Sequence, residues 1–187
     1  MNYVGDNMKV HEEHKLEANG KKNLNIALIV VSISRYEEFK TQNSTSDKTI
    51  PLVKELIYNE EKISLTYTKI IPDSVDHIED TLEEFLEKTD VDVIIFSGGT
   101  GLSPKDITYE TIKPKFEKII PGFGELFRYL SYKEIGSAAM LSRAIGGKIR
   151  DKAVFLLPGS PNAVKMAMRD LILPELAHIC YVINKKE

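Results

Sequence analysis

A glycine-rich turn gives this sequence its clearest sign of chemistry, because "SGGTG" directly follows the apolar run "VDVIIF". Glycine lacks a Cβ atom, so a ligand can come close to the backbone and positive φ angles are allowed. Successive N–H groups in such a turn form a nest for phosphate oxygens, and two hydroxyl side chains add donors. The alternative is a tight strand-to-helix turn without a ligand. The predicted substrate-binding residues of this turn are Ser97, Gly98, Gly99, Thr100 and Gly101.

Two aspartates also follow predicted strand ends, Asp73 in "IIPDSV" and Asp106 in "SPKDIT". Each can simply cap the helix that follows it, and Ser74 competes with Asp73 for that role. Two carboxylates that face a phosphate-binding loop need a cation between them. Mg²⁺ is the ion that combines carboxylate and phosphate oxygens. We therefore predict Asp73 and Asp106 as metal-binding and catalytic residues, with capping as the alternative.

A second turn, in "FLLPGSPNAV", closes another apolar run. Its proline and glycine form the turn, its serine offers a hydroxyl, and its second proline suits the first turn of a helix. A plain Pro-Gly turn explains the same pattern without any ligand. The predicted substrate-binding residues here are Pro158, Gly159, Ser160 and Pro161.

Apolar runs that alternate with amphipathic segments must position these residues. Short, almost wholly apolar runs predict strands covered on both faces, and helical spacing of apolar residues predicts helices between them. The predicted strands are 24–32, 63–71, 91–96 and 153–158; the predicted helices are 47–61, 73–88, 109–119, 123–134 and 161–183, the last broken at Pro174. The polar stretch 34–47 is predicted to be a long loop. This alternation predicts a three-layer α/β/α fold with a mainly parallel sheet.

The predicted fold brings the candidate residues to one edge. Ligands of such sheets bind outside the carboxyl ends of the strands, near a switch in strand order. Four segments fall at strand ends, namely 32–35, 72–74, 97–101 and 158–161. We expect their polar residues to converge on one cleft.

Composition limits the remaining possibilities. A length of 187 residues suits one domain, predicted here as residues 24–187, with the polar segment 1–23 as a flexible N-terminal arm. No apolar run approaches the ~20 residues of a membrane-spanning helix, and a net charge of −3 argues against a nucleic-acid partner. Cys180 is the only cysteine, so a Cys-rich zinc site is excluded. A cytoplasmic location is expected.

Five motifs, in their order and spacing, resemble the MoaB/Mog family of molybdenum cofactor biosynthesis proteins: "SGGTG", "SPKDIT", "IPGFGELFR", "AAMLSRAIGG" and "LPGSPNAV". The resemblance implies a three-layer fold that binds molybdopterin and, in active members, adenylylates its phosphate with ATP and Mg²⁺, releasing pyrophosphate. It also implies a homotrimer or hexamer, with the molybdate-insertion enzyme as a candidate partner. The family positions carry over as Ser97–Gly101 for the pterin and phosphate cradle, Asp73 and Asp106 for the acidic pair, and Pro158–Pro161 for the bordering loop.

Two positions depart from the family pattern, and other functions stay open. Arg35 stands where many members have aspartate after the first strand, and Thr49 stands in place of a glycine. Lys48 or Lys105 is expected to offset the repulsion between two polyanionic substrates. The alternatives are a molybdopterin carrier without turnover, a scaffold, and the related fold of nucleotide-pyrophosphatase and deamidase-associated proteins. That last fold is expected to have a second acidic residue beside Asp106, where this chain has isoleucine.

Overall fold

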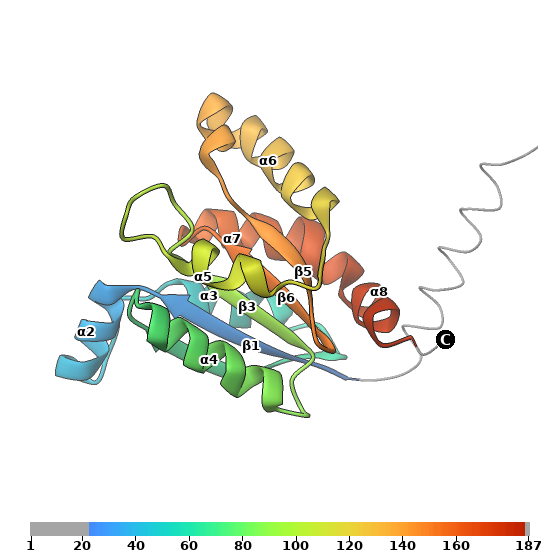
Figure 1. Cartoon of the computed structure of the whole chain (residues 1–187), viewed down its shortest axis with the longest axis horizontal. Coiled ribbons are helices and arrows are strands. Elements are labelled where there is room, and N and C mark those ends of the chain that lie inside the picture. Colours follow the sequence, from blue (N-terminus) through green and yellow to red (C-terminus); the bar gives the residue numbers. More distant parts are fainter. Residues whose placement is uncertain (1–22, 186–187) are drawn as a thin grey trace, which may run out of the picture.

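A computed structural model describes residues 23–185, so almost the whole predicted N-terminal arm lies outside the described residues. Six strands form one sheet in the order β2-β1-β3-β6-β5-β4 (Figure 1). The parallel strands are β1 (Leu24–Val31), β2 (Ile63–Ile71), β3 (Val93–Ser97) and β6 (Lys152–Leu157). Strand β5 (Ile145–Ile149) pairs antiparallel with β6, and β4 (Lys118–Ile119) pairs antiparallel with β5. The predicted mainly parallel sheet is confirmed.

The central strands are apolar throughout because helices cover both faces of the sheet (Figure 1). Successive side chains of a strand point to opposite faces, so Val93 and Ile95 enter one core while Ile94 and Phe96 enter the other. The helices that pack on the first face are α3 (Thr49–Ile57), α6 (Pro121–Ile135), α7 (Pro161–Ala167) and α8 (Leu173–Asn184). Those on the second are α4 (Val75–Glu87) and α5 (Thr108–Ile112). This arrangement is the predicted three-layer α/β/α fold.

The prediction of a long loop at 34–47 was wrong, because helix α2 (Ile33–Gln42) occupies most of it. The helix has no buried residue, so its sequence shows no apolar stripe. Its ends hold it instead: the Ser32 hydroxyl accepts a hydrogen bond from the N–H of Arg35, and Asn43 ends the helix in the left-handed conformation.

Strands β4 and β5 were not predicted, and the helix predicted over 109–119 ends early. Helix α5 stops at Ile112, a 3-10 turn spans Lys113–Lys115, and β4 follows. Strand β5 contains Gly146 and Gly147, which weaken strand propensity. Gly147 is needed because a Cβ atom there would lie 2.3 Å from the carbonyl oxygen of Lys118 on the neighbouring strand, and one at Gly146 would lie 2.6 Å from Cδ1 of Phe155.

The chain is helical from Pro161 to Asn184, and a π-helical turn at Met168–Ile172 joins α7 to α8 just before Pro174. Helix α6 continues into a 3-10 turn at Gly136–Leu141. Within residues 23–185, no helix has both the length and the apolar character that crossing a membrane requires.

Candidate ligand-binding site

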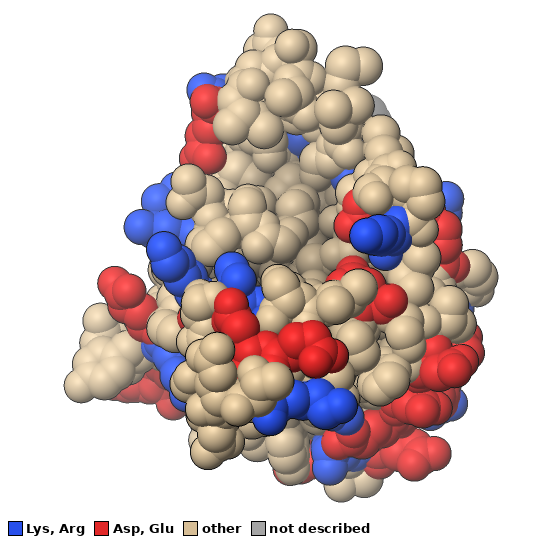
Figure 2. Space-filling model, turned by 90° about the vertical axis from the view of Figure 1, so that its left-hand side faces the viewer, with Lys and Arg blue, Asp and Glu red and all other residues tan. Residues whose placement is uncertain are grey.

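A cleft of about 840 Å³ lies at the carboxyl ends of the parallel strands. Strand order switches between β1 and β3, which places the cleft where ligand sites form in such sheets. The face that carries these strand ends is hollowed, with acidic and basic side chains around the hollow (Figure 2). All four predicted segments contribute to the lining, through Ser32, Arg35, Asp73, Ser97–Gly101 and Pro158–Pro161, joined by Asp106. The expected convergence is confirmed.

The glycines of the loop are required by its geometry. Gly98 has a φ of 110° and Gly99 a φ of 64°, a region that side chains with a Cβ rarely adopt. A Cβ atom at Gly98 would lie 2.2 Å from the carbonyl oxygen of Val31, and one at Gly99 would lie 2.2 Å from Thr108 Oγ1. The backbone of the loop therefore packs directly against strand β1 and helix α5, which only glycine at these two positions allows.

The same loop leaves backbone donors without a protein partner. Gly98 N–H donates to Leu157 O (3.0 Å), and Gly99 O accepts from Thr108 N–H (2.9 Å). By contrast, no acceptor within residues 23–185 takes the N–H groups of Gly99, Thr100 or Gly101. Unpaired backbone donors at a cleft are satisfied by water or a ligand, and consecutive ones favour an anion.

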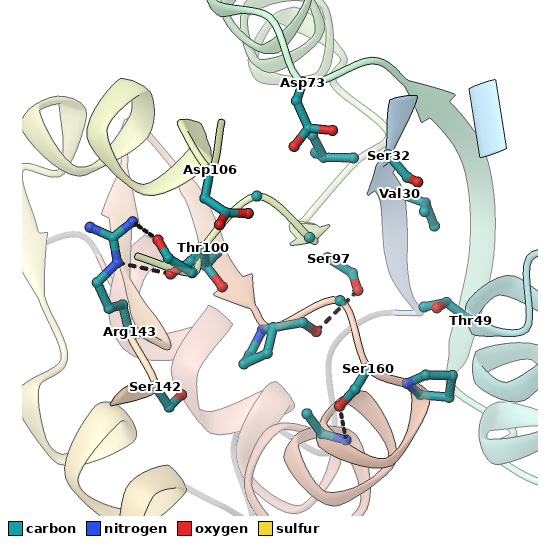
Figure 3. Close-up of a pocket in the computed structure, with 18 of the residues that line it drawn as sticks. Val30, Ser32, Thr49, Asp73, Ser97, Thr100, Asp106, Ser142, Arg143 and Ser160 are labelled. Atoms are coloured by element: carbon teal, nitrogen blue, oxygen red, sulfur yellow. Dashed lines mark hydrogen bonds between the residues drawn. The ribbon is translucent and has the colours of Figure 1, made fainter. Parts of the chain in front are cut away.

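The capping alternative for the two aspartates is wrong. The Ser74 hydroxyl, and not Asp73, caps α4 by accepting the N–H of His77 (3.3 Å). Asp73 Oδ2 instead accepts the N–H of Ile33 (3.1 Å). Asp106 Oδ2 accepts the N–H of Ser103 (3.1 Å), and α5 begins without a side-chain cap. Both carboxylates thus hold loop segments together, and both lie at the cleft (Figure 3).

Asp73 and Asp106 both lie against the glycine loop. A Cβ atom at Gly99 would lie 3.0 Å from Asp73 Oδ1, and one at Gly101 would lie 2.7 Å from Asp106 Oδ2. Burial raises the pKa of the Asp73 carboxyl; the hydrogen bond from Ile33 opposes this shift, and the negative charge of Asp106 adds to it. Neither carboxylate forms an ion pair with a cation of the described chain.

These two carboxylates fit a divalent cation, since one between them would relieve both the burial and the repulsion. The residues described include no group of three or more His, Cys, Asp or Glu side chains that could hold a metal ion. Two protein carboxylates hold Mg²⁺ well only when phosphate oxygens and water complete its shell. The donor set therefore suits an ion that arrives with a phosphorylated ligand.

Basic residues line the cleft beside the β1 end. Arg35 and Lys48 are both part of the lining, whereas Lys105 is not. Within the described chain neither Arg35 nor Lys48 forms an ion pair, so both charges are available to an anion. The Asp47 carboxylate, also in the lining, accepts the N–H of Ile50 (2.8 Å) and so helps to fix the start of α3.

The opposite wall of the cleft is largely apolar. Helix α6 contributes Phe127, Ser131 and Ile135, and the 3-10 turn that follows contributes Ala138 and Leu141. The cleft thus combines an apolar wall with a polar, charged floor, which is typical of sites for ligands with a flat ring and a charged group.

The lining also includes polar residues that were not predicted as site residues, among them Asp47, Thr49, Ser142 and Arg143. The hydroxyl of Ser142 is buried and has no hydrogen-bond partner among the described residues. Arg143 donates to the carbonyl oxygen of Thr100 (2.8 Å) and pairs with Glu110. Both belong to "AAMLSRAIGG", a motif that the sequence singled out without giving its residues a role.

Comparison with known proteins identifies the family. Residues 27–178 match the family described as "Probable molybdopterin binding domain". The chain belongs to the MoaB/Mog family. The molybdenum cofactor biosynthesis protein B of Bacillus cereus is 42% identical over 175 residues, which cover 93% of this chain and 98% of that protein.

Solved structures of family members share the fold. A crystal structure of a molybdenum cofactor biosynthesis protein B superposes with a TM-score of 0.79 at 42% identity, covering 88% of this chain and 98% of that one. The tungsten cofactor synthesizing protein MoaB from Pyrococcus furiosus superposes with a TM-score of 0.76 at 36% identity, covering 89% and 100%. This MoaB-type chain therefore belongs to molybdenum cofactor biosynthesis.

Proposed function

We propose that this protein binds molybdopterin in the cleft and transfers the AMP group of ATP to the molybdopterin phosphate, releasing pyrophosphate. One observation carries the proposal: the loop with three consecutive N–H groups without a protein partner, at Gly99, Thr100 and Gly101, packs against two carboxylates without a counter-charge. The N–H groups suit a phosphate monoester, and the carboxylates suit the Mg²⁺ that accompanies ATP.

Different residues of the cleft would bind the two polyanionic substrates, molybdopterin and ATP. The glycine loop would hold the molybdopterin phosphate, with the hydroxyls of Ser97 and Thr100 beside it. Asp73 and Asp106 would hold Mg²⁺, which supplies charge neutralisation at the phosphates of ATP. Arg35 and Lys48 would lie against the rest of the triphosphate. Pro158–Pro161 border the loop: a Cβ atom at Gly159 would lie 3.2 Å from the Cα of Gly98.

The chemistry needs positioning more than a base. An oxygen of the molybdopterin phosphate attacks the α-phosphorus of ATP, and the bond from that phosphorus to the bridging oxygen breaks. Pyrophosphate leaves with the electron pair of the broken bond. Because the attacking phosphate is already ionised near neutral pH, catalysis reduces to alignment and charge stabilisation. The requirement for ATP suits a cytoplasmic location, and the adenylylated product would pass to the molybdate-insertion enzyme.

A homotrimer or hexamer is part of the proposal. Leu126, Tyr129, Tyr132 and Ile135 are exposed at three-residue spacing along α6, and such a stripe favours contact between copies. Sedimentation should give the mass of three or six chains, and Tyr132→Glu should lower it. A wild-type mass of one chain at micromolar concentration would contradict this part.

Pyrophosphate release tests the proposed reaction. Protein, molybdopterin and Mg-ATP are mixed, and pyrophosphate and adenylylated pterin are quantified for wild type, Asp106→Asn and the control Asp80→Asn. Asp80 is an exposed aspartate of α4 outside the cleft. We expect wild type and Asp80→Asn to turn over alike and Asp106→Asn to be about 10²-fold slower. Tight pterin binding without pyrophosphate would identify a carrier, and absence of binding would identify a scaffold.

A further inference from the structure

Arg143 forms an unusually complete set of contacts with the glycine loop (Figure 3). Its Nε donates to Thr100 O (2.8 Å) and its Nη2 donates to Gly101 O. Nη1 and Nη2 also bond the two carboxylate oxygens of Glu110, with Nη2 to Oε2 at 3.1 Å. The guanidinium carbon lies 4.6 Å from the ring centroid of Tyr109. One side chain thus joins the loop to helix α5.

These contacts orient the loop. In a trans peptide the N–H of the next residue points away from the carbonyl oxygen, and the described chain has no cis peptide bond. Holding the carbonyls of Thr100 and Gly101 on the Arg143 side therefore turns the N–H groups of Gly101 and Leu102 to the other side. Asp73 and Ser97 lie on that other side of Thr100 in Figure 3.

We infer that Arg143 is a positioning residue, which aims the N–H group of Gly101 at the end of the glycine loop into the cleft without itself binding the substrate. The inference rests on the proposed function, since it takes the loop as the phosphate cradle. Four hydrogen bonds and a ring contact already occupy the guanidinium, so it has little capacity left for a phosphate. Arg35, in contrast, has no ion pair within the described chain.

Lysine cannot replace this arginine. The planar, forked guanidinium of arginine binds two backbone carbonyls and a carboxylate at once, whereas the ammonium group of lysine is a point charge without that geometry. Arg143→Lys keeps the charge and loses the fork, so it separates positioning from simple attraction of anions. Glu110 binds the other side of the guanidinium, and its hydrogen bond with Arg143 lowers the pKa of the Glu110 carboxyl.

The test measures loop order and affinity separately, by NMR of the full-length protein. The amide signals of Gly99 to Leu102 report the order of the loop, and titration with inorganic phosphate and with molybdopterin gives the two affinities. In Arg143→Lys we expect broadened loop amides, faster amide hydrogen exchange there, and about 10- to 100-fold weaker binding of both ligands. The KM for molybdopterin should rise by a similar factor with a smaller change in kcat.

Arg150→Lys is the matched control, because Arg150 also pairs with a carboxylate, Glu83 (2.6 Å), but lies outside the cleft. It should leave loop amides and affinities as in wild type. Glu110→Gln keeps the contacts of Arg143 with the two carbonyl groups, so it should have a smaller effect than Arg143→Lys. It replaces Arg143→Lys in the test if Arg143→Lys does not fold. Loop amides and affinity unchanged in both Arg143→Lys and Glu110→Gln would overturn the inference. Wild-type amides that respond to neither ligand would instead contradict the proposed function, while the change in loop order in Arg143→Lys would still test whether Arg143 orients the loop.

Discussion

Replacing Gly101 with alanine displaces Asp106 while leaving the fold largely intact. The new Cβ atom would lie 2.7 Å from Asp106 Oδ2 and 3.3 Å from Cγ. The carboxylate must therefore withdraw by about 0.7 Å to reach an ordinary contact of 3.4 Å. It can do so because Asp106 is a partly exposed side chain at the cleft, not backbone.

The cost in stability should be small. The displaced carboxylate loses the hydrogen bond from Ser103 N–H (3.1 Å), worth about 1 kcal/mol for a partly exposed pair. A domain of this size loses about 2–4 °C of Tm for each kcal/mol. Alanine also reduces the freedom of the unfolded chain, which offsets part of the loss. We expect Tm to fall by no more than about 4 °C.

The cost in activity should be large. A carboxylate held away from its productive position by this much is expected to slow turnover about 10²-fold. Pyrophosphate release and scanning calorimetry on the same preparation give the two numbers. Gly122→Ala is the control, since nothing lies within 4 Å of its Cβ position in helix α6. It should keep full activity and an equal or slightly higher Tm.

Two results would refute this reasoning. Full turnover in Gly101→Ala, with Asp106 shown by crystallography to have moved, would mean that Asp106 does not act in the reaction. A loss of Tm far above 4 °C would mean that the alanine disrupts the loop as a whole and not one carboxylate.

Two further substitutions separate charge at the site from support of the fold. Burial raises the pKa of the Asp73 carboxyl above its value in the unfolded chain. The protonated carboxyl therefore contributes to the stability of the folded protein below the unfolded pKa, and this contribution is lost as pH rises through the folded pKa. Asp73→Asn should therefore be more stable than wild type at pH 7, with no gain at pH 3, while turnover falls; a lower Tm at pH 7 would contradict this sign. Ser74→Ala removes the cap of α4 and should cost about 1 kcal/mol, measured by urea unfolding, with pyrophosphate release unchanged. A loss of activity in Ser74→Ala at full stability would mean that Ser74 acts in the site.

The parts of the fold that the sequence predicted are those buried on both sides. Strands β1, β3 and β6 read as continuous apolar runs because each lies between two helical layers. Strands β2 and β3 both run parallel to β1, which made the convergence of Asp73 and the glycine loop predictable as well, since parallel strands end at the same edge. Ser97 and Asp73 thus came together as expected.

The parts that it missed have tertiary causes. Helix α2 buries no residue and so carries no apolar period. Strand β5 contains two glycines, Gly147 because strand β4 lies close to it and Gly146 because the Phe155 ring does, and glycine does not favour strands in isolation. Arg143 contacts carbonyl groups more than 40 residues earlier in the chain. Such a contact cannot be predicted from a local sequence pattern.

Calorimetric titration of the wild-type protein with molybdopterin, and with the same pterin lacking its phosphate, tests the central claim most directly. If backbone N–H groups of the glycine loop hold the phosphate, molybdopterin should bind about 100-fold more tightly than the dephosphorylated compound, because the loop donors are then left unpaired. Equal affinity for the two compounds, or no binding of molybdopterin, would contradict the assignment of this cleft.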